Sequence, residues 1–124
     1  MKTVGYLLGT DPEVLSRLVC MGYQTLPLGN GIDGHGKYIG FITIEDRINL
    51  IVGYIHKVTP HSSFNISTRD LLNPGIIHDI PMLLVAPHDK IEEAKKIVSE
   101  ITDSKFIMVI TPDKLMDETL KHIK

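Results

Sequence analysis

Residues 48–58 (INLIVGYIHKV) decide the fold class of this chain. They are apolar with few interruptions and rich in β-branched side chains, a pattern typical of a strand covered on both faces. Residues 81–86 (PMLLVA) and 105–111 (KFIMVIT) repeat the pattern, and residues 3–8 (TVGYLL) and 23–28 (YQTLPL) are shorter apolar stretches. These five segments predict a sheet whose strands are buried between two layers of helices.

Helical patterns alternate with these strands. Asp11 and Pro12 suit the cap and first residue of a helix that Gly22 closes, and Asp89 with Glu92 has the spacing of a capping box. The expected helices cover residues 12–21, 38–46, 67–79, 90–102 and 112–123, the third being interrupted at Asn73-Pro74-Gly75. The alternation predicts a single α/β domain over residues 1–124: a three-layer, Rossmann-like fold with a mostly parallel sheet of about five strands and helices on both faces.

The composition narrows the function classes. The 124 residues carry a net charge of −2, with 43% hydrophobic and 23% charged residues, so there is no general positive field for nucleic acid or an anionic membrane. No stretch approaches the ~20 apolar residues of a membrane span, and no signal-peptide pattern is present. We expect a cytoplasmic protein without a cofactor, and a buried, structural role for Cys20, the single cysteine.

Ligands of open α/β sheets bind beyond the carboxyl ends of the strands. This rule selects four segments of the chain: Gly9-Thr10-Asp11, residues 28–40, residues 56–63 and Pro87-His88-Asp89. Backbone N–H groups at the start of a following helix make such places natural anion sites. The sequence therefore predicts a small-ligand site along this edge of the sheet.

The second of these segments is unusually rich in glycine. Glycine is costly to order, so residues 28–40 must either approach a ligand closely or make tight turns. Asp33, His35 and Lys37 occupy alternate positions in this segment. They could act as a base and an anion clamp, or they could be polar side chains of a solvated loop. The spacing is neither that of a dinucleotide-binding fingerprint nor that of a P-loop. The candidate backbone contacts are Gly29, Gly31 and Gly34.

Each candidate has a structural alternative. Gly9-Thr10-Asp11 is equally a tight turn with a helix cap, and Asp89 is best interpreted as a cap. His35, His56 and His61 could together hold a metal ion, but the last two are five residues apart across a strand end, which is not a standard ligand spacing, and no metal site is predicted. Ser62 adjoins His61, yet a catalytic pair is defined by geometry rather than by adjacency.

In the order of its segments the chain resembles the methylglyoxal synthase-like domain family. That family includes methylglyoxal synthase, the regulatory domain of carbamoyl phosphate synthetase and the cyclohydrolase of purine synthesis. The resemblance is carried by Leu8-Gly9-Thr10-Asp11 after the first strand, the glycine-rich stretch GNGIDG (29–34), the strand INLIV (48–52), Pro60-His61 at its exit, and the strand IPMLL (80–84).

The resemblance implies a doubly wound sheet, a homo-oligomer and a small phosphorylated or anionic ligand. Asp33 would stand at the position of the catalytic carboxylate of methylglyoxal synthase, and His61 at that of its pocket histidine. The chain departs from the family where Leu8 and Asp11 replace two threonines of the phosphate turn and where Ser62 replaces an aspartate. A further family strand, which carries an aspartate and a phosphate-binding lysine, has no counterpart.

Three functions remain open from the sequence. The first is a small anionic-ligand-binding or regulatory domain, with its site at the carboxyl ends of the strands. The second is an enzyme of the methylglyoxal synthase-like type, in which Asp33 is the general base and His61 an electrophile or proton shuttle. The third is an assembly subunit that packs Phe41 or Ile76-Ile77 on another chain.

Overall fold

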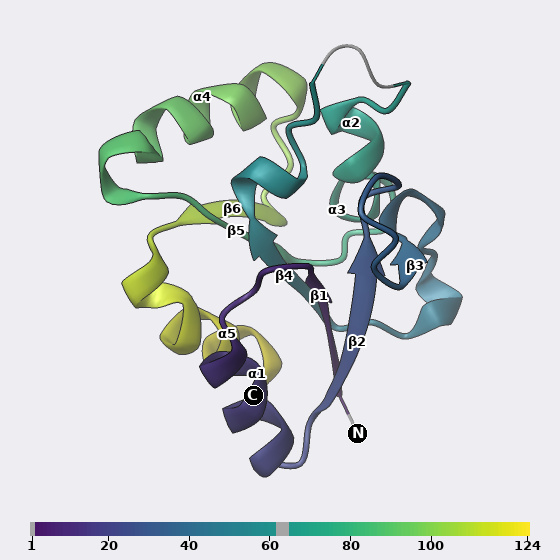
Figure 1. Cartoon of the computed structure of the whole chain (residues 1–124), viewed down its shortest axis with the longest axis vertical. Helices are drawn as coiled ribbons and strands as arrows, with labels where there is room; N and C mark the ends of the chain where they lie inside the picture. The colour runs from purple at the N-terminus through teal and green to yellow at the C-terminus, as the bar shows by residue number, and fades with distance from the viewer. Residues whose placement is uncertain (1, 62–64) are drawn as a thin grey trace.

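The structure, a computed structural model, describes residues 2–61 and 65–124 (Figure 1). Within these residues the centre is one sheet of six strands, in the order β3-β2-β1-β4-β5-β6, and every neighbouring pair is parallel. The strands are β1 (Thr3–Leu7), β2 (Gln24–Gly29), β3 (Lys37–Tyr38), β4 (Leu50–Tyr54), β5 (Met82–Val85) and β6 (Ile107–Ile110).

Helices cover both faces of the sheet. One face carries α1 (Pro12–Cys20) and α5 (Leu115–Ile123), and the other carries α2 (Thr68–Leu71), α3 (Asn73–Ile77) and α4 (Ile91–Ile101) (Figure 1). The connections contain the short 3-10 helices η1 (Ile39–Phe41), η2 (Ile44–Asp46), η3 (Ile55–Lys57), η4 (His88–Lys90) and η5 (Pro112–Lys114). The predicted α/β, Rossmann-like architecture is confirmed.

The central strands contribute to two separate apolar clusters. In β4, Leu50 and Val52 pack under α1 and α5, whereas Ile51 packs under α2, α3 and α4. All four residues of β5 are buried and alternate between the clusters in the same way. Because both faces are covered, these strands have no polar side, which explains their continuous apolar sequence.

The strand order shows where the chain changes direction across the sheet. From β1 it proceeds to β2 and β3 on one side, and from β4 it proceeds to β5 and β6 on the other. Counted with the two-residue β3, this is the 3-2-1-4-5-6 order of dinucleotide-binding sheets, and the five longer strands alone follow the flavodoxin order. The switch point therefore lies between the carboxyl ends of β1 and β4. The sheet has one strand more than the predicted five, because β3 is a two-residue strand inside the glycine-rich segment.

The helix expected over residues 38–46 is wrong. Tyr38 ends β3, and η1 and η2 follow it. The Thr43 side chain accepts the N–H of Glu45, while the Asp46 carboxylate accepts the N–H of Thr43. These bonds begin a new turn at Thr43, and Arg47, with φ at 56°, ends that turn in the left-handed conformation.

Other boundaries differ in detail. The strand expected over residues 48–58 extends only from Leu50 to Tyr54, and η3 begins at the next residue, Ile55. The helix expected over 67–79 forms as α2 and α3, which meet at Leu72; Pro74 lies in the first turn of α3, where its missing N–H costs nothing. The capping role expected for Asp89 is wrong, because it lies inside η4, and α4 starts from Lys90 without a side-chain cap bond.

The expectation for Cys20 is also wrong, because its side chain is exposed. Val14 and Leu18 are the buried residues of α1, and Cys20 lies two positions after Leu18, on the opposite side of the helix. Across residues 2–61 and 65–124, the structure contains no helix that has both the length and the apolar character to cross a membrane.

Thr119 of α5 provides a test of the core. Its side chain is 0% exposed, and its hydroxyl oxygen has no hydrogen-bond partner among the described residues. Because an unsatisfied buried hydroxyl is costly, Thr119→Val should raise the free energy of unfolding by about 1 kcal/mol. The reverse change in the same cluster, Val85→Thr, should lower it. Urea denaturation of the two variants measures both signs, and a destabilised Thr119→Val would contradict the expectation.

Candidate functional site

The candidate site lies where the loop after β2 meets the exit of β4. We call residues 30–36 the glycine loop; it follows the carboxyl end of β2, in blue in Figure 1. The side-chain amide of Asn30 donates to the carbonyl of Lys57 in η3 at 3.1 Å, and its oxygen accepts the N–H groups of Ile32 and Asp33. Asn30 is 7% exposed. This one amide therefore shapes the glycine loop and fixes it to the segment after β4.

Asp33 and Lys57 face each other across this junction. One carboxylate oxygen of Asp33, Oδ1, accepts the N–H of His35 at 3.1 Å. The other, Oδ2, is buried without a hydrogen-bond partner among the described residues, and Lys57 Nζ stands 4.0 Å from it. The side chains are 12% and 21% exposed, respectively. A separation of 4.0 Å is too long for a hydrogen bond. Asp33 Oδ2 can therefore still accept a hydrogen bond, and Lys57 Nζ can still donate one to another group.

His35 faces a different neighbour. Its Nδ1 lies 3.0 Å from the carbonyl oxygen of Leu28, so Nδ1 carries the proton in that contact and Nε2 of the neutral ring is left as an acceptor. The ring meets that of Tyr6 in β1 edge-to-face, with centroids 5.4 Å apart. The ring of His35 therefore extends the site toward β1.

Lys37 is directed away from Asp33. Its ammonium donates to Oδ1 of Asp46 at 2.6 Å, and Oδ2 of Asp46 accepts the N–H of Thr43. The hydrogen bond from Lys37 and then that from Thr43 lower the pKa of Asp46 below its ordinary value. Lys37 thus holds β3 to η2 rather than contributing to the junction at Asp33.

The turn after β1 is built as a helix start. Gly9 has φ at 88°, and the buried hydroxyl of Thr10 donates to the carbonyl of Leu7 at 2.7 Å. Asp11 accepts the N–H of Glu13 and so caps α1. The structure shows the turn-and-cap arrangement, and the negative charge of Asp11 occupies the place where an anion would meet the helix.

The remaining candidates are dispersed. His56 is exposed, and its ring lies 5.8 Å from that of Tyr54. His61 is exposed, and Ser62 lies outside the described residues. No group of three or more histidine, cysteine or acidic side chains that could hold a metal ion exists within residues 2–61 and 65–124. His35, His56 and His61 are therefore not brought together as a metal site.

The apolar residues considered for assembly are divided between surface and core. Phe41 and Ile77 are 71% and 60% exposed, whereas Ile76 packs against the cluster under α2, α3 and α4. Ile44 is also exposed. Within residues 2–61 and 65–124, Phe41, Ile44 and Ile77 stay largely exposed, although the ring of Tyr38 meets that of Phe41 edge-to-face.

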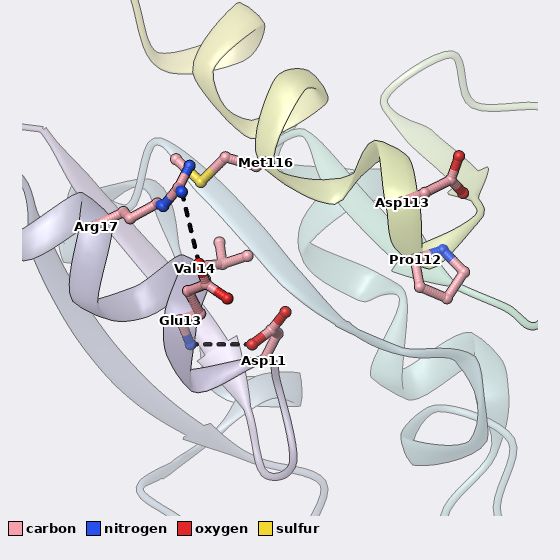
Figure 2. A pocket seen from close by; sticks show the side chains of 7 residues that line it. All are labelled: Asp11, Glu13, Val14, Arg17, Pro112, Asp113 and Met116. Carbon is pink, nitrogen blue, oxygen red and sulfur yellow. Dashed lines mark hydrogen bonds and ion pairs between the residues drawn. The ribbon is translucent and has the colours of Figure 1, made fainter.

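A small hollow of about 200 Å³ opens between α1 and the start of α5. Figure 2 shows Asp11, Glu13 and Arg17 on one side and Pro112 and Met116 on the other, with the Asp113 carboxylate directed away. Glu13 pairs with Arg17 at 3.5 Å, and both are exposed. The polar groups of this hollow are thus already engaged, those of α1 with one another and Asp113 with His88, and they offer less to a ligand than Asp33 and Lys57 do.

Asn30 and Lys57 were not singled out by the sequence analysis. Lys57 fell in a selected segment, and the Asn-Gly pair at Asn30-Gly31 signals a turn. Nothing local, however, shows that the amide of Asn30 reaches a carbonyl 27 residues away.

Comparison of the chain with protein-family models, with curated proteins and with solved structures yields no match in any of the three. The resemblance to the methylglyoxal synthase-like family therefore stays a prediction.

The glycines between residues 29 and 36 are explained by the way this stretch of the chain folds. A Cβ on Gly36 would overlap the backbone carbonyl of Pro27, and a Cβ on Gly29 would lie 2.8 Å from the carbonyl oxygen of His35. Gly31 and Gly34 adopt φ values of 84° and 66°. The close approach of neighbouring backbone thus explains the glycines at positions 29 and 36, without any ligand.

Two alanine substitutions separate these causes. Gly34 and Gly36 are both left-handed, but open space surrounds the Cβ position of Gly34. Gly34→Ala should lower the free energy of unfolding by about 1 kcal/mol, the cost of the backbone conformation alone. Gly36→Ala adds the overlap with Pro27 and should cost several times more. Equal losses in urea denaturation would show that the glycine loop is not packed against β2.

Proposed function

We propose that this domain binds a small anionic metabolite at the carboxyl edge of the sheet, in contact with Asp33 and Lys57. The observation that carries the proposal is the incomplete pairing of these two side chains. A buried carboxylate oxygen without a donor is costly, and natural proteins rarely leave one without a reason. Its position, beside the exit of β4 at the switch point of the sheet, is where open α/β sheets bind their ligands.

The chemistry of the pair indicates the class of ligand. Asp33 Oδ2 needs a hydrogen-bond donor, such as a hydroxyl or an amine of the ligand. The ammonium of Lys57 has donors to offer, which suit a carboxylate or a phosphate. A hydroxylated or aminated metabolite that carries one such anionic group satisfies both side chains at once.

The same geometry supports an anionic group near Lys57 rather than at α1. Asp11 already accepts a backbone N–H at the start of α1, and its charge repels a second anion there. In this proposal the turn after β1 contributes only to the shape of the site, and Lys57 of η3 provides the positive charge that binds the anion.

An enzyme is the alternative function that the same observation favours. A general base requires a carboxylate oxygen that can accept a proton from the substrate, and Asp33 Oδ2 accepts no hydrogen bond from the described residues. In the methylglyoxal synthase-like interpretation, Asp33 is that base and His61 assists it. Incubation of each bound compound with the protein, followed by NMR, distinguishes turnover from binding alone.

A thermal-shift screen tests the proposal, using hydroxycarboxylates, amino acids, sugar phosphates, nucleotides and inorganic phosphate. A ligand at a hundredfold excess over its Kd should stabilise the protein by about 2.7 kcal/mol. Asp33→Asn and Lys57→Met should each abolish the rise in Tm, because each removes one half of the recognition.

The chain offers a matched control for this screen. Lys37 and Asp46 form a second lysine–aspartate pair, and Asp46→Asn and Lys37→Met should leave the ligand-induced shift intact. A shift that persists in both Asp33→Asn and Lys57→Met would move the site elsewhere, and flat curves for every compound class would remove the proposal.

A further inference from the structure

The two outermost strands of the sheet, β3 and β6, differ in how they are protected against pairing with another chain. β3, at one margin, is two residues long and carries Lys37, and a short, charged edge strand discourages pairing with another chain. β6, at the opposite margin in Figure 1, is an unbroken four-residue strand, in register with β5 from Ile107 to Ile110. Residues 106–111 (FIMVIT) contain neither a charge nor a proline. This edge has none of the usual protection.

The hydrogen bonds to β5 define which backbone groups of β6 face outward. Met82 donates its N–H to Phe106, and Ala86 donates to Ile110. In a parallel pair, alternate residues bond to the same neighbour, so Met108 also faces β5. The N–H and C=O groups of Ile107 and Val109 and the N–H of Thr111 therefore point away from the sheet, as a template for one more strand. The C=O of Thr111 already accepts the N–H of Lys114.

The side chains along this edge are apolar and partly open. Phe106 is 41% exposed, and Met108 and Val109 are half-buried. A hollow of about 450 Å³ follows the edge beneath α4, lined by residues of β6 and by Lys95, Val98 and Ser99 of α4. A partner that pairs with β6 would cover both the backbone groups and this hollow.

We infer that this partner is a second copy of the chain, paired antiparallel through β6 around a two-fold axis at Val109. In this register Val109 opposes the partner's Val109, and Ile107 opposes the partner's Thr111. Every outward-facing donor of the strand then meets an acceptor, and the carbonyl of Thr111, which already accepts the N–H of Lys114, uses its second lone pair. The two six-stranded sheets would become one continuous sheet, with α4 of both copies on the same face.

Charge complementarity favours a second copy over an unrelated peptide. Lys105 lies four residues before Val109, and Asp113, in η5, lies four residues after it. The two-fold axis therefore brings Lys105 toward the partner's Asp113, and the same contact occurs twice. Asp113 also bonds His88 within its own copy, through Oδ1 at 3.0 Å. A parallel arrangement would instead place like charges together.

The first test is the mass of the full chain in solution. Light scattering after size exclusion should give twice the 13.9 kDa of the monomer. Val109→Pro removes an outward N–H but no bond to β5, so it should give a monomer that still melts cooperatively. Val109→Thr retains the N–H and should remain a dimer. A wild-type monomer at all accessible concentrations, or a dimer that survives Val109→Pro, would overturn the inference.

Charge reversal tests the register and does not depend on the folding of Val109→Pro. Lys105→Glu and Asp113→Lys should each weaken dimerisation, by roughly tenfold, and the double variant should restore it. Lys2→Glu, on the residue before β1, is the control and should change nothing. A double variant weaker than both single variants would exclude this register.

Amide hydrogen exchange in the wild-type protein provides a direct reading of the pairing. Slow exchange at Ile107, Val109 and Thr111, as at Met108 and Ile110, is the expected result for the dimer. Fast exchange at these three amides in a protein of dimer mass would place the interface on another surface.

Discussion

All strands of this sheet run in one direction, and most of the molecule depends on that constraint. Parallel neighbours cannot be joined by a hairpin, so each connection must cross a face of the sheet. The crossings supply α1 on one face and α2, α3 and α4 on the other, and α5, which follows β6, joins α1. Together these helices bury all of β5 and all of β4 except Tyr54. The same constraint gathers all the carboxyl ends at one edge, where the chain turns outward from β1 and β4 in opposite directions.

A second level of organisation rests on one buried amide. Asn30 uses its oxygen to turn the glycine loop and its nitrogen to hold the carbonyl of Lys57. The loop can then return along β2, where Gly36 passes too close to Pro27 for any side chain, and form β3. Asp33 is positioned by this loop and Lys57 by η3, so the incomplete pairing between them arises from two segments that are fixed independently.

The sequence predicted the parts of the fold that depend on local pattern. Strands such as β4 and β5 have side chains that must be apolar on both faces, and α1 has a cap and periodic residues that need no tertiary information. β3 was missed because its two residues form a strand only through the return of the glycine loop. The helix over residues 38–46 failed because Thr43 caps a new turn within it. The edge was predicted as the site, but the bond from Asn30 to Lys57 joins distant residues and leaves no sequence pattern.

The contacts of the aromatic rings have an optical consequence. The chain has no tryptophan and four tyrosines, so tyrosine alone determines its intrinsic emission. Tyr6 lies against the ring of His35, and Tyr54, at the end of β4, lies against that of His56. Two of the four phenol rings thus border a histidine ring, and both belong to strands whose carboxyl ends lie at the proposed site. The carboxyl edge of the sheet therefore carries its own spectroscopic reporters, which need neither a dye nor a substitution.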